Sequence, residues 1–311
     1  MSDNSAQPYD ENRFSNLLVL GNGFDLDLGY ATSYEQFVNN GFDPNHGQFP
    51  FVKGGVYHTL GQDVCSATCA NWYNLENVLA AFGENHAAPA EVKGNMEDYA
   101  LLVDRLRLYL SSIDYTNPDK DSVAGKLLLA LYNCEAPFVT YSFNYTDFCD
   151  IADALDMEVN PAIHVHGALK ENNIILGVGD YAKLDSASDF LYKTSNNNYR
   201  ATNLVFDLEA FDNIYIFGLS LSSVDYPYFE DFFKRIASGV EERQHKKYIR
   251  IFTYDDKSKM EILRNLRHMN SGMIRLRNYA DLDIIRTKDN IDEAKVAEII
   301  NKISSEWVID V

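Results

Sequence analysis

The feature that most constrains this chain is a short apolar run, Leu17–Leu20, that leads directly into Gly21-Asn22-Gly23. A continuous apolar run of this length, closed by glycine, is typical of a strand buried on both faces of a parallel sheet. Stretches with helical spacing of apolar residues separate further runs of the same kind. These runs are Phe138–Phe143, Ala162–Val165, Ile174–Val178, Ile214–Phe217 and Tyr248–Tyr254. Alternating strands and helices predict an α/β fold with a largely parallel sheet.

The chain changes character between residues 38 and 135, where it reads as an insertion between strands. Residues 38–70 are rich in Gly, Asn and Pro, which favours irregular loops. Three helices are predicted in the rest of the insertion, the first where apolar residues keep helical spacing from Trp72 to Phe82, and the others over 97–113 and 122–134. Further helices are predicted at 147–156, 227–238, 257–270 and 291–305. We therefore expect a flexible arm at 1–15 and a single domain over 16–311 that carries a helical insertion at about 38–135.

Composition narrows the classes of function. Lys and Arg total 27 against 46 Asp and Glu, which gives a formal charge of −19 and disfavours a nucleic-acid partner. No apolar run approaches the roughly 20 residues of a membrane helix, and no cationic leader precedes an apolar stretch. We therefore expect a cytoplasmic protein with no membrane partner. Cys65 and Cys69 have no second pair at zinc-binding spacing, so no metal is expected.

The glycine loop after the first strand suits a nucleotide. Gly21 and Gly23 would let the backbone approach a pyrophosphate closely, and free N–H groups at the next helix start would bind it. The spacing matches neither GxGxxG nor a P-loop, and a tight strand-to-helix turn without a ligand is the alternative. Asp25 and Asp27 are expected to meet ribose hydroxyls or backbone donors instead of phosphate. Thr32 or Ser33 is the expected cap of the helix that contains Tyr34 and Phe37.

Polar residues also follow two later strands. Asn144 could orient a water or a ribose, or alternatively form an Asx turn or a helix cap with Thr146. His164 and His166 alternate along a strand and are expected to point to one face, where they could bind a metal or supply an acid or base. Because Gly167 ends that strand, we expect His166 to be the reactive histidine and His164 to be structural and more deeply buried.

The loop after Ile214–Phe217 carries hydroxyl groups and a carboxylate. Gly218, Ser220 and Asp225 suit contacts with ribose and phosphate, while the alternative is a helix start capped by Asp225 with Pro227 in its first turn. Ser220 does not lie in a Gly-x-Ser-x-Gly elbow, which disfavours a serine hydrolase. These residues extend the expected site to a fourth strand end, and ligands of such sheets lie at those ends.

Four segments together resemble AbiH-like proteins, a bacterial family associated with abortive phage infection. They are GNGFDLDLGYATSYEQF, SFNYTD, HVHGAL with IILGVGD, and FGLSLSSVDYPYF. The resemblance covers about residues 16–230, in order. It implies a role in anti-phage defence, with a phage-encoded trigger or a second copy of the chain as partner.

The same blocks resemble a distant sirtuin pattern. Gly21, Gly23 and Gly29 keep the offsets of the sirtuin glycine loop, and Ser142–Thr146 is similar to its T-Q-N-x-D block. His166-Gly167 is similar to its catalytic His-Gly, and Gly218-Leu219-Ser220-Leu221 to its G-T-S-L loop. The resemblance implies a Rossmann-like fold, with helices on both faces of the sheet, that binds NAD. The chain departs from the sirtuin residues at Asn22, Asp25, Thr32 and Tyr34, and it lacks the sirtuin zinc ribbon.

The leading hypothesis is an NAD glycohydrolase. Asn144 and His166 are its expected catalytic residues, through contacts with water and ribose or as a base near neutral pH. The expected NAD-binding residues are Gly21, Asn22, Gly23, Asp25, Gly29, Thr32, Tyr34, Gly218, Ser220 and Asp225. The alternatives are a non-catalytic nucleotide-sensing module and a metal-dependent phosphoesterase or nuclease that uses the His164/His166 pair.

Overall fold

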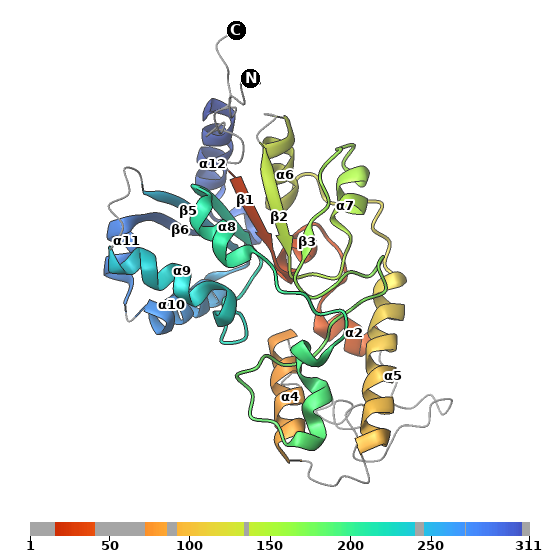
Figure 1. The fold of residues 1–311 in the computed structure, drawn as a ribbon. Coiled ribbons are helices and arrows are strands. Elements are labelled where there is room, and N and C mark those ends of the chain that lie inside the picture. Colours follow the sequence, from red (N-terminus) through yellow and green to blue (C-terminus); the bar gives the residue numbers. More distant parts are fainter. Residues whose placement is uncertain are drawn as a thin grey trace, which may run out of the picture.

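A computed structural model describes residues 16–40, 72–85, 92–133, 137–239, 246–270 and 272–306. Six strands in these ranges form one sheet in the order β3-β2-β1-β4-β5-β6, and every adjacent pair is parallel (Figure 1). They are β1 (Asn16–Leu20), β2 (Phe138–Ser142), β3 (Ile163–His164), β4 (Asn213–Phe217), β5 (Lys247–Thr253) and β6 (Ala280–Arg286). This strand order is that of a Rossmann-like doubly wound sheet, so the predicted α/β fold is confirmed.

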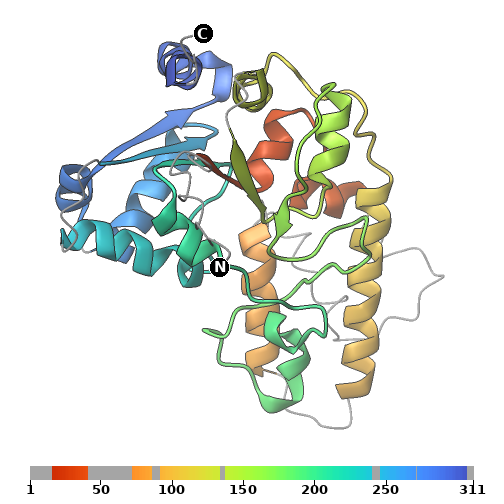
Figure 2. The ribbon, with the colours of Figure 1, turned by 45° about the horizontal axis from the view of Figure 1, so that its top comes forward.

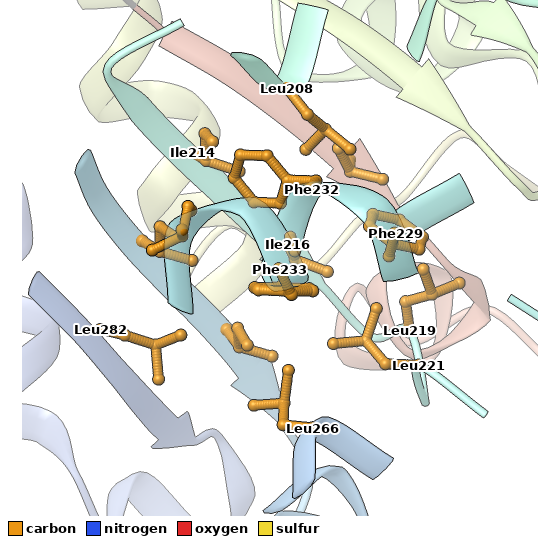
Figure 3. Close-up of a cluster of buried hydrophobic side chains, with 14 of the residues drawn as sticks. Leu208, Ile214, Ile216, Leu219, Leu221, Phe229, Phe232, Phe233, Leu266 and Leu282 are labelled. Carbon is orange, nitrogen blue, oxygen red and sulfur yellow. The ribbon is translucent and has the colours of Figure 1, made fainter. Parts of the chain in front are cut away.

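Helices cover both faces of the sheet because successive strand residues are apolar and point to opposite sides. Leu17 and Val19 of β1 pack on one face, whereas Leu18 and Leu20 pack on the other, and all four are buried. The first face is covered by α8 (Leu204–Ala210), α9 (Tyr226–Ser238), α10 (Asp256–Asn270) and α11 (Met273–Tyr279). Figure 3 shows Phe232 and Phe233 of α9 packed over β4.

The opposite face is covered by α1 (Asn22–Asp27), α6 (Val123–Asn133), α7 (Phe148–Ala154) and α12 (Glu293–Glu306). We predicted residues 122–134 as the third helix of the insertion. In the structure α6 instead packs on the sheet, where its Leu127, Leu128 and Leu131 are buried beside β1 and α12. Its apolar face therefore completes the sheet layer.

Below the sheet in Figures 1 and 2 lie α2 (Tyr34–Asn40), α4 (Trp72–Asn85) and α5 (Val92–Ser111). Their buried apolar side chains form a separate hydrophobic cluster with those of the short turn η2 (Ser186–Leu191), which is followed by the turn η3 (Lys193–Ser195). We call these elements, with residues 174–192 that pack among them, the helical module. Because α4 and η3 lie next to the carboxyl ends of the strands, the module can contribute side chains to a site there.

The structure differs from the sequence prediction in four elements. The apolar run at 174–178 is no strand; it packs in the helical module and makes one isolated bridge, Val178 to Tyr192. Neither β6 nor the helices α8 and α11 were predicted. Residues 38–40, the start of the loops predicted over 38–70, instead end the helix α2. The arm at 1–15, residues 41–70, and Cys65 with Cys69 lie outside the described residues. No helix within the described ranges is long and apolar enough to cross a membrane.

Candidate functional site

A cavity of about 450 Å³ lies at the carboxyl ends of β1, β2 and β4. The chain order reverses between β1 and β4, and ligands of doubly wound sheets bind at this switch point. The cavity volume is also in the range of small-molecule sites. Ten of the predicted site residues line it: Gly21, Asn22, Gly23, Asp25, Thr32, Asn144, His166, Gly218, Ser220 and Asp225.

Two predicted residues lie elsewhere. Gly29 follows the last turn of α1 with a φ of +92°, a conformation that suits glycine at a helix end. Tyr34 is buried in the helical module against Phe37. Ser33 caps α2 through a reciprocal pair of hydrogen bonds with Gln36, as predicted for Thr32 or Ser33. Gly29 and Tyr34 therefore shape the turn and the core around the cavity.

The glycine loop packs directly against the loop after β4. A Cβ on Gly21 would lie 2.7 Å from the Gly218 carbonyl oxygen, and one on Gly23 would lie 2.6 Å from Gly218 Cα. The N–H groups of Gly21 and Gly23 donate to the carbonyls of Phe217 and Gly218, and that of Phe24 donates to Gly21. These three N–H groups are satisfied within the protein, so a pyrophosphate at this loop would need other donors.

Asp25 lies at the base of the cavity with its carboxylate held on both oxygens. Asn144 Nδ2 donates to Oδ1 at 2.8 Å, and Thr146 Oγ1 donates to Oδ2 at 2.8 Å. Burial raises the pKa of Asp25 to about 7, although both hydrogen bonds oppose this rise. The carboxyl group therefore exchanges its proton near neutral pH and is held in one orientation.

Asn144 reaches across from β2 to the glycine loop. Its Nδ2 also donates to the Gly21 carbonyl at 3.0 Å, so the amide joins the ends of β1 and β2. Neither Asn144 nor Thr146 caps the helix that follows. Asp147 caps α7 instead, by accepting from Cys149 N and Asp150 N. The amide of Asn144 thus positions Asp25, a role that sequence reasoning did not assign to it.

His166 lies in the cavity wall beside the helical module. Its Nε2 is 3.4 Å from Lys193 Nζ, and Lys193 in turn bonds Glu76 Oε1 at 2.6 Å. Burial lowers the pKa of His166 well below its ordinary value, and the Lys193 charge lowers it further. The lowered pKa keeps the imidazole neutral at physiological pH and makes it a weaker base than an ordinary histidine.

The relative burial of the two histidines is the reverse of the prediction. His166 is buried at 8% exposure, whereas His164 is only half-buried, with Nδ1 3.0 Å from the Asn144 carbonyl oxygen. β3 ends at His164, so His166 lies beyond the strand and the expected strand alternation does not apply. His164 does not line the cavity, and no three potential metal ligands gather anywhere in the described ranges.

Asp225 faces the cavity from the start of α9. Its Oδ2 accepts from the N–H of Ser222 at 3.0 Å and from Ser220 Oγ at 3.4 Å. Burial raises the pKa of Asp225 to about 7, and the negative charge of Glu76 also raises it. Although Asp225 occupies the cap position, its side chain makes no capping bond to α9. Its carboxyl group, like that of Asp25, therefore titrates near neutral pH.

Sequence reasoning missed Glu76 and Lys193. Glu76 lines the cavity from α4, and its Oε2 is a buried atom without a hydrogen-bond partner among the described residues. Nothing in the local sequence marks either residue, since each looks like an ordinary helix or loop charge. Their partners are distant in sequence: Lys193 and Glu76 are 117 residues apart.

The cavity wall is acidic. Of the described residues that line it, none is Lys or Arg, whereas four are acidic: Asp25, Glu76, Asp225 and Glu261. The remaining wall includes aromatic and aliphatic side chains such as Phe143 and Leu219. A wall of this kind stabilises a bound positive charge, because the charge is partly removed from water beside carboxylates.

Comparison with known families gives one partial match. Residues 135–243 match the family model described as "Bacteriophage abortive infection AbiH". The matched segment is about a third of the chain and carries Asn144, His166, Lys193 and Asp225. No curated protein matches the chain.

Proposed function

We propose that this chain, whose residues 135–243 match the model of the bacteriophage abortive infection AbiH family, is a member of that family and hydrolyses the nicotinamide–ribose bond of NAD in anti-phage defence. The observation that carries the proposal is the pair of buried carboxyl groups of Asp25 and Asp225. Both line one cavity at the switch point of a Rossmann-like sheet, and both titrate near neutral pH. A general base works best when its pKa is close to the working pH.

The acidic wall suits the charge of this reaction. The nicotinamide ring of NAD is cationic, and cleavage of its bond to ribose passes through an oxocarbenium-like state. Asp225, which forms no ion pair among the described residues, would stabilise that positive charge in its ionised form, while Glu76 is paired with Lys193. Because nicotinamide leaves as a neutral molecule, the reaction needs a base for water and no acid for the leaving group. The expected pyrophosphate cradle at Gly21–Gly23 adds little support, because the N–H groups of Gly21 and Gly23 already donate to the carbonyls of Phe217 and Gly218.

Asp25 is the residue that we assign as the base. Asn144 and Thr146 each hold one of its oxygens, which fixes the carboxylate toward one position in the cavity. Asp25 would remove the proton of the attacking water, and Asn144 would act by orienting Asp25. His166, neutral and buried, would contribute a hydrogen-bonding wall.

The test is to incubate the purified protein with NAD and measure free nicotinamide by chromatography, beside calorimetric titration of NAD. Loss of a catalytic base or positioning group lowers rates by about 100- to 1,000-fold, so Asp25→Asn should lose turnover to this extent and still bind NAD. Asp153→Asn, on the exposed side of α7, is the matched control and should behave as wild type. Wild-type turnover by Asp25→Asn would overturn the assignment. Binding by wild type without turnover would instead favour a nucleotide-sensing module.

A further inference from the structure

The helical module places a buried ammonium group against the imidazole of the site. Lys193 is 6% exposed on the turn η3, and its Nζ lies 3.4 Å from His166 Nε2. Glu76 of α4 holds the same Nζ at 2.6 Å. A carboxylate this close compensates a buried ammonium group for the water that it has lost.

The chemistry of these groups decides where the proton of the histidine lies. An ammonium group has three donors and no acceptor, so Nε2 of His166 accepts the contact from Lys193. The proton of a neutral imidazole is then on Nδ1. We infer that Lys193, held by Glu76, fixes His166 as the neutral tautomer protonated on Nδ1 and is a positioning residue of the site.

The surroundings of His166 support one protonation state. Phe143 and Tyr228 pack edge-on against its ring, with centroids 5.4 Å and 6.1 Å away. A second proton on Nε2 would make the ring cationic and place it against the ammonium group of Lys193 in a buried site. The carboxylate of Glu76 cannot compensate for this charge, because it already pairs with Lys193. Asp225 is the other charged group near Lys193. Only the Nδ1-protonated neutral ring satisfies Lys193 without such repulsion.

This inference deepens the proposed function in one respect: the helical module sets the state of a residue in the wall of the Rossmann-like site. Nδ1 of His166 is buried, and a backbone hydrogen bond from the ring to Val165 opposes the lowering of its pKa. Because Nε2 accepts from Lys193, the Nδ1–H group is the hydrogen-bond donor of the ring. The effect on turnover rests on the proposed function, whereas the tautomer itself can be measured on the protein without substrate.

The experiment is histidine ¹⁵N NMR on the full chain, with the His166 signals among the seven histidines assigned by loss in His166→Gln. We expect wild-type His166 to show a protonated Nδ1 and a bare Nε2, unchanged from about pH 5.5 to about pH 8. Lys193→Met should bring in the Nε2-protonated tautomer and raise the pKa of His166, because the repelling charge is gone. Lys170→Met, an exposed lysine that pairs with Asp150, is the matched control and should leave the His166 signals unchanged.

Two outcomes would overturn the inference: a proton on Nε2 in wild type, or an unchanged tautomer in Lys193→Met. If Lys193→Met fails to fold because Glu76 is left buried and unpaired, the double variant Glu76→Gln/Lys193→Met removes both charges and takes its place. Failure of wild type to hydrolyse NAD would overturn the proposed function while leaving the tautomer result intact. The two proposals are therefore tested separately.

Discussion

At residue 23 the space between the glycine loop and the loop after β4 admits a hydrogen atom but no methyl group. A Cβ there would lie 2.6 Å from Gly218 Cα, which is backbone and cannot rotate away. We predict that Gly23→Ala lowers the free energy of unfolding by about 1–3 kcal/mol, whether or not a ligand is present. Urea denaturation measures this change.

Gly29→Asn is the comparison for that variant. Gly29 has a positive φ but nothing within 4 Å of its Cβ position, and asparagine tolerates this backbone region better than other residues. Its cost should be well below that of Gly23→Ala. Equal stabilities for Gly23→Ala and wild type would show that the two loops are not packed as described.

The carboxyl group of Asp25 makes stability depend on pH. Its pKa rises from 3.8 when exposed to about 7 in the folded protein, so the folded state binds the proton more tightly. The protonated carboxyl group therefore adds roughly 4 kcal/mol to the free energy of unfolding below about pH 4. This contribution is lost as the pH rises to about 7. We predict that Asp25→Asn gains stability relative to wild type as pH rises through this range.

Denaturation at several pH values gives the difference between the variant and wild type. Subtracting the wild-type curve removes the contribution of other titrating groups. Asp292 is one of them, and its effect on stability has the opposite pH dependence because Arg286 lowers its pKa. Thr146→Val, which removes the hydroxyl group that donates to Asp25 Oδ2, is measured beside Asp25→Asn and should enlarge the pH dependence, because that hydrogen bond lowers the pKa of Asp25. A difference between Asp25→Asn and wild type that stays constant with pH would mean that Asp25 titrates as an exposed carboxyl group does.

Single residues of the site were predictable where a strand end carries an unusual polar group. Asn144 and His166 were found in this way, and both line the cavity. Their roles were not predictable, because they depend on partners more than 20 residues away, such as Asp25 for Asn144 and Lys193 for His166. His166 is also more deeply buried than His164 because Phe143 and Tyr228 pack against its ring, and no local sequence pattern reveals these contacts.

At the scale of elements, the start of α7 depends on Asp147. Its carboxylate accepts from the N–H groups of Cys149 and Asp150, which would otherwise lack partners in the first turn. We predict that Asp147→Ala lowers the free energy of unfolding by about 1 kcal/mol. Asp153→Ala, an exposed change in the last turn of α7, should be neutral or slightly stabilising, because a negative charge there opposes the helix dipole. Equal losses in both variants, measured by urea denaturation, would contradict the capping role.

The sequence predicts elements whose apolar pattern matches their burial, and it misses those whose pattern does not. β1 and β4 are apolar after their first residues, Asn16 and Asn213, and were predicted. β6 alternates Asp281 and Asp283 with buried residues, so its pattern is weaker than that of a strand buried on both faces. Residues 174–178 are as apolar as a strand, yet their side chains pack in the helical module. Periodicity reports that a segment is buried but does not identify what buries it.

At the scale of the whole molecule, charge decides which large partners are excluded. With 46 acidic against 27 basic residues, the chain carries a formal charge of −19. We predict no binding of labelled duplex DNA in fluorescence anisotropy at about 0.15 M salt and protein on the order of 10 μM, because non-specific binding relies on neutralised phosphates. A basic DNA-binding domain serves as positive control. Saturable binding that weakens with salt would revive the nuclease alternative.

The position of β1 in the sheet has a consequence for the timing of synthesis. β1 is made early, yet Asn16 pairs with Asn213, 197 residues further along the chain. At a translation rate of about 5–20 residues per second, the wall formed by Gly218 and Asp225 leaves the ribosome roughly 10–40 seconds after Asp25 does. A nascent chain therefore holds its proposed base long before it has a cavity in which to use it.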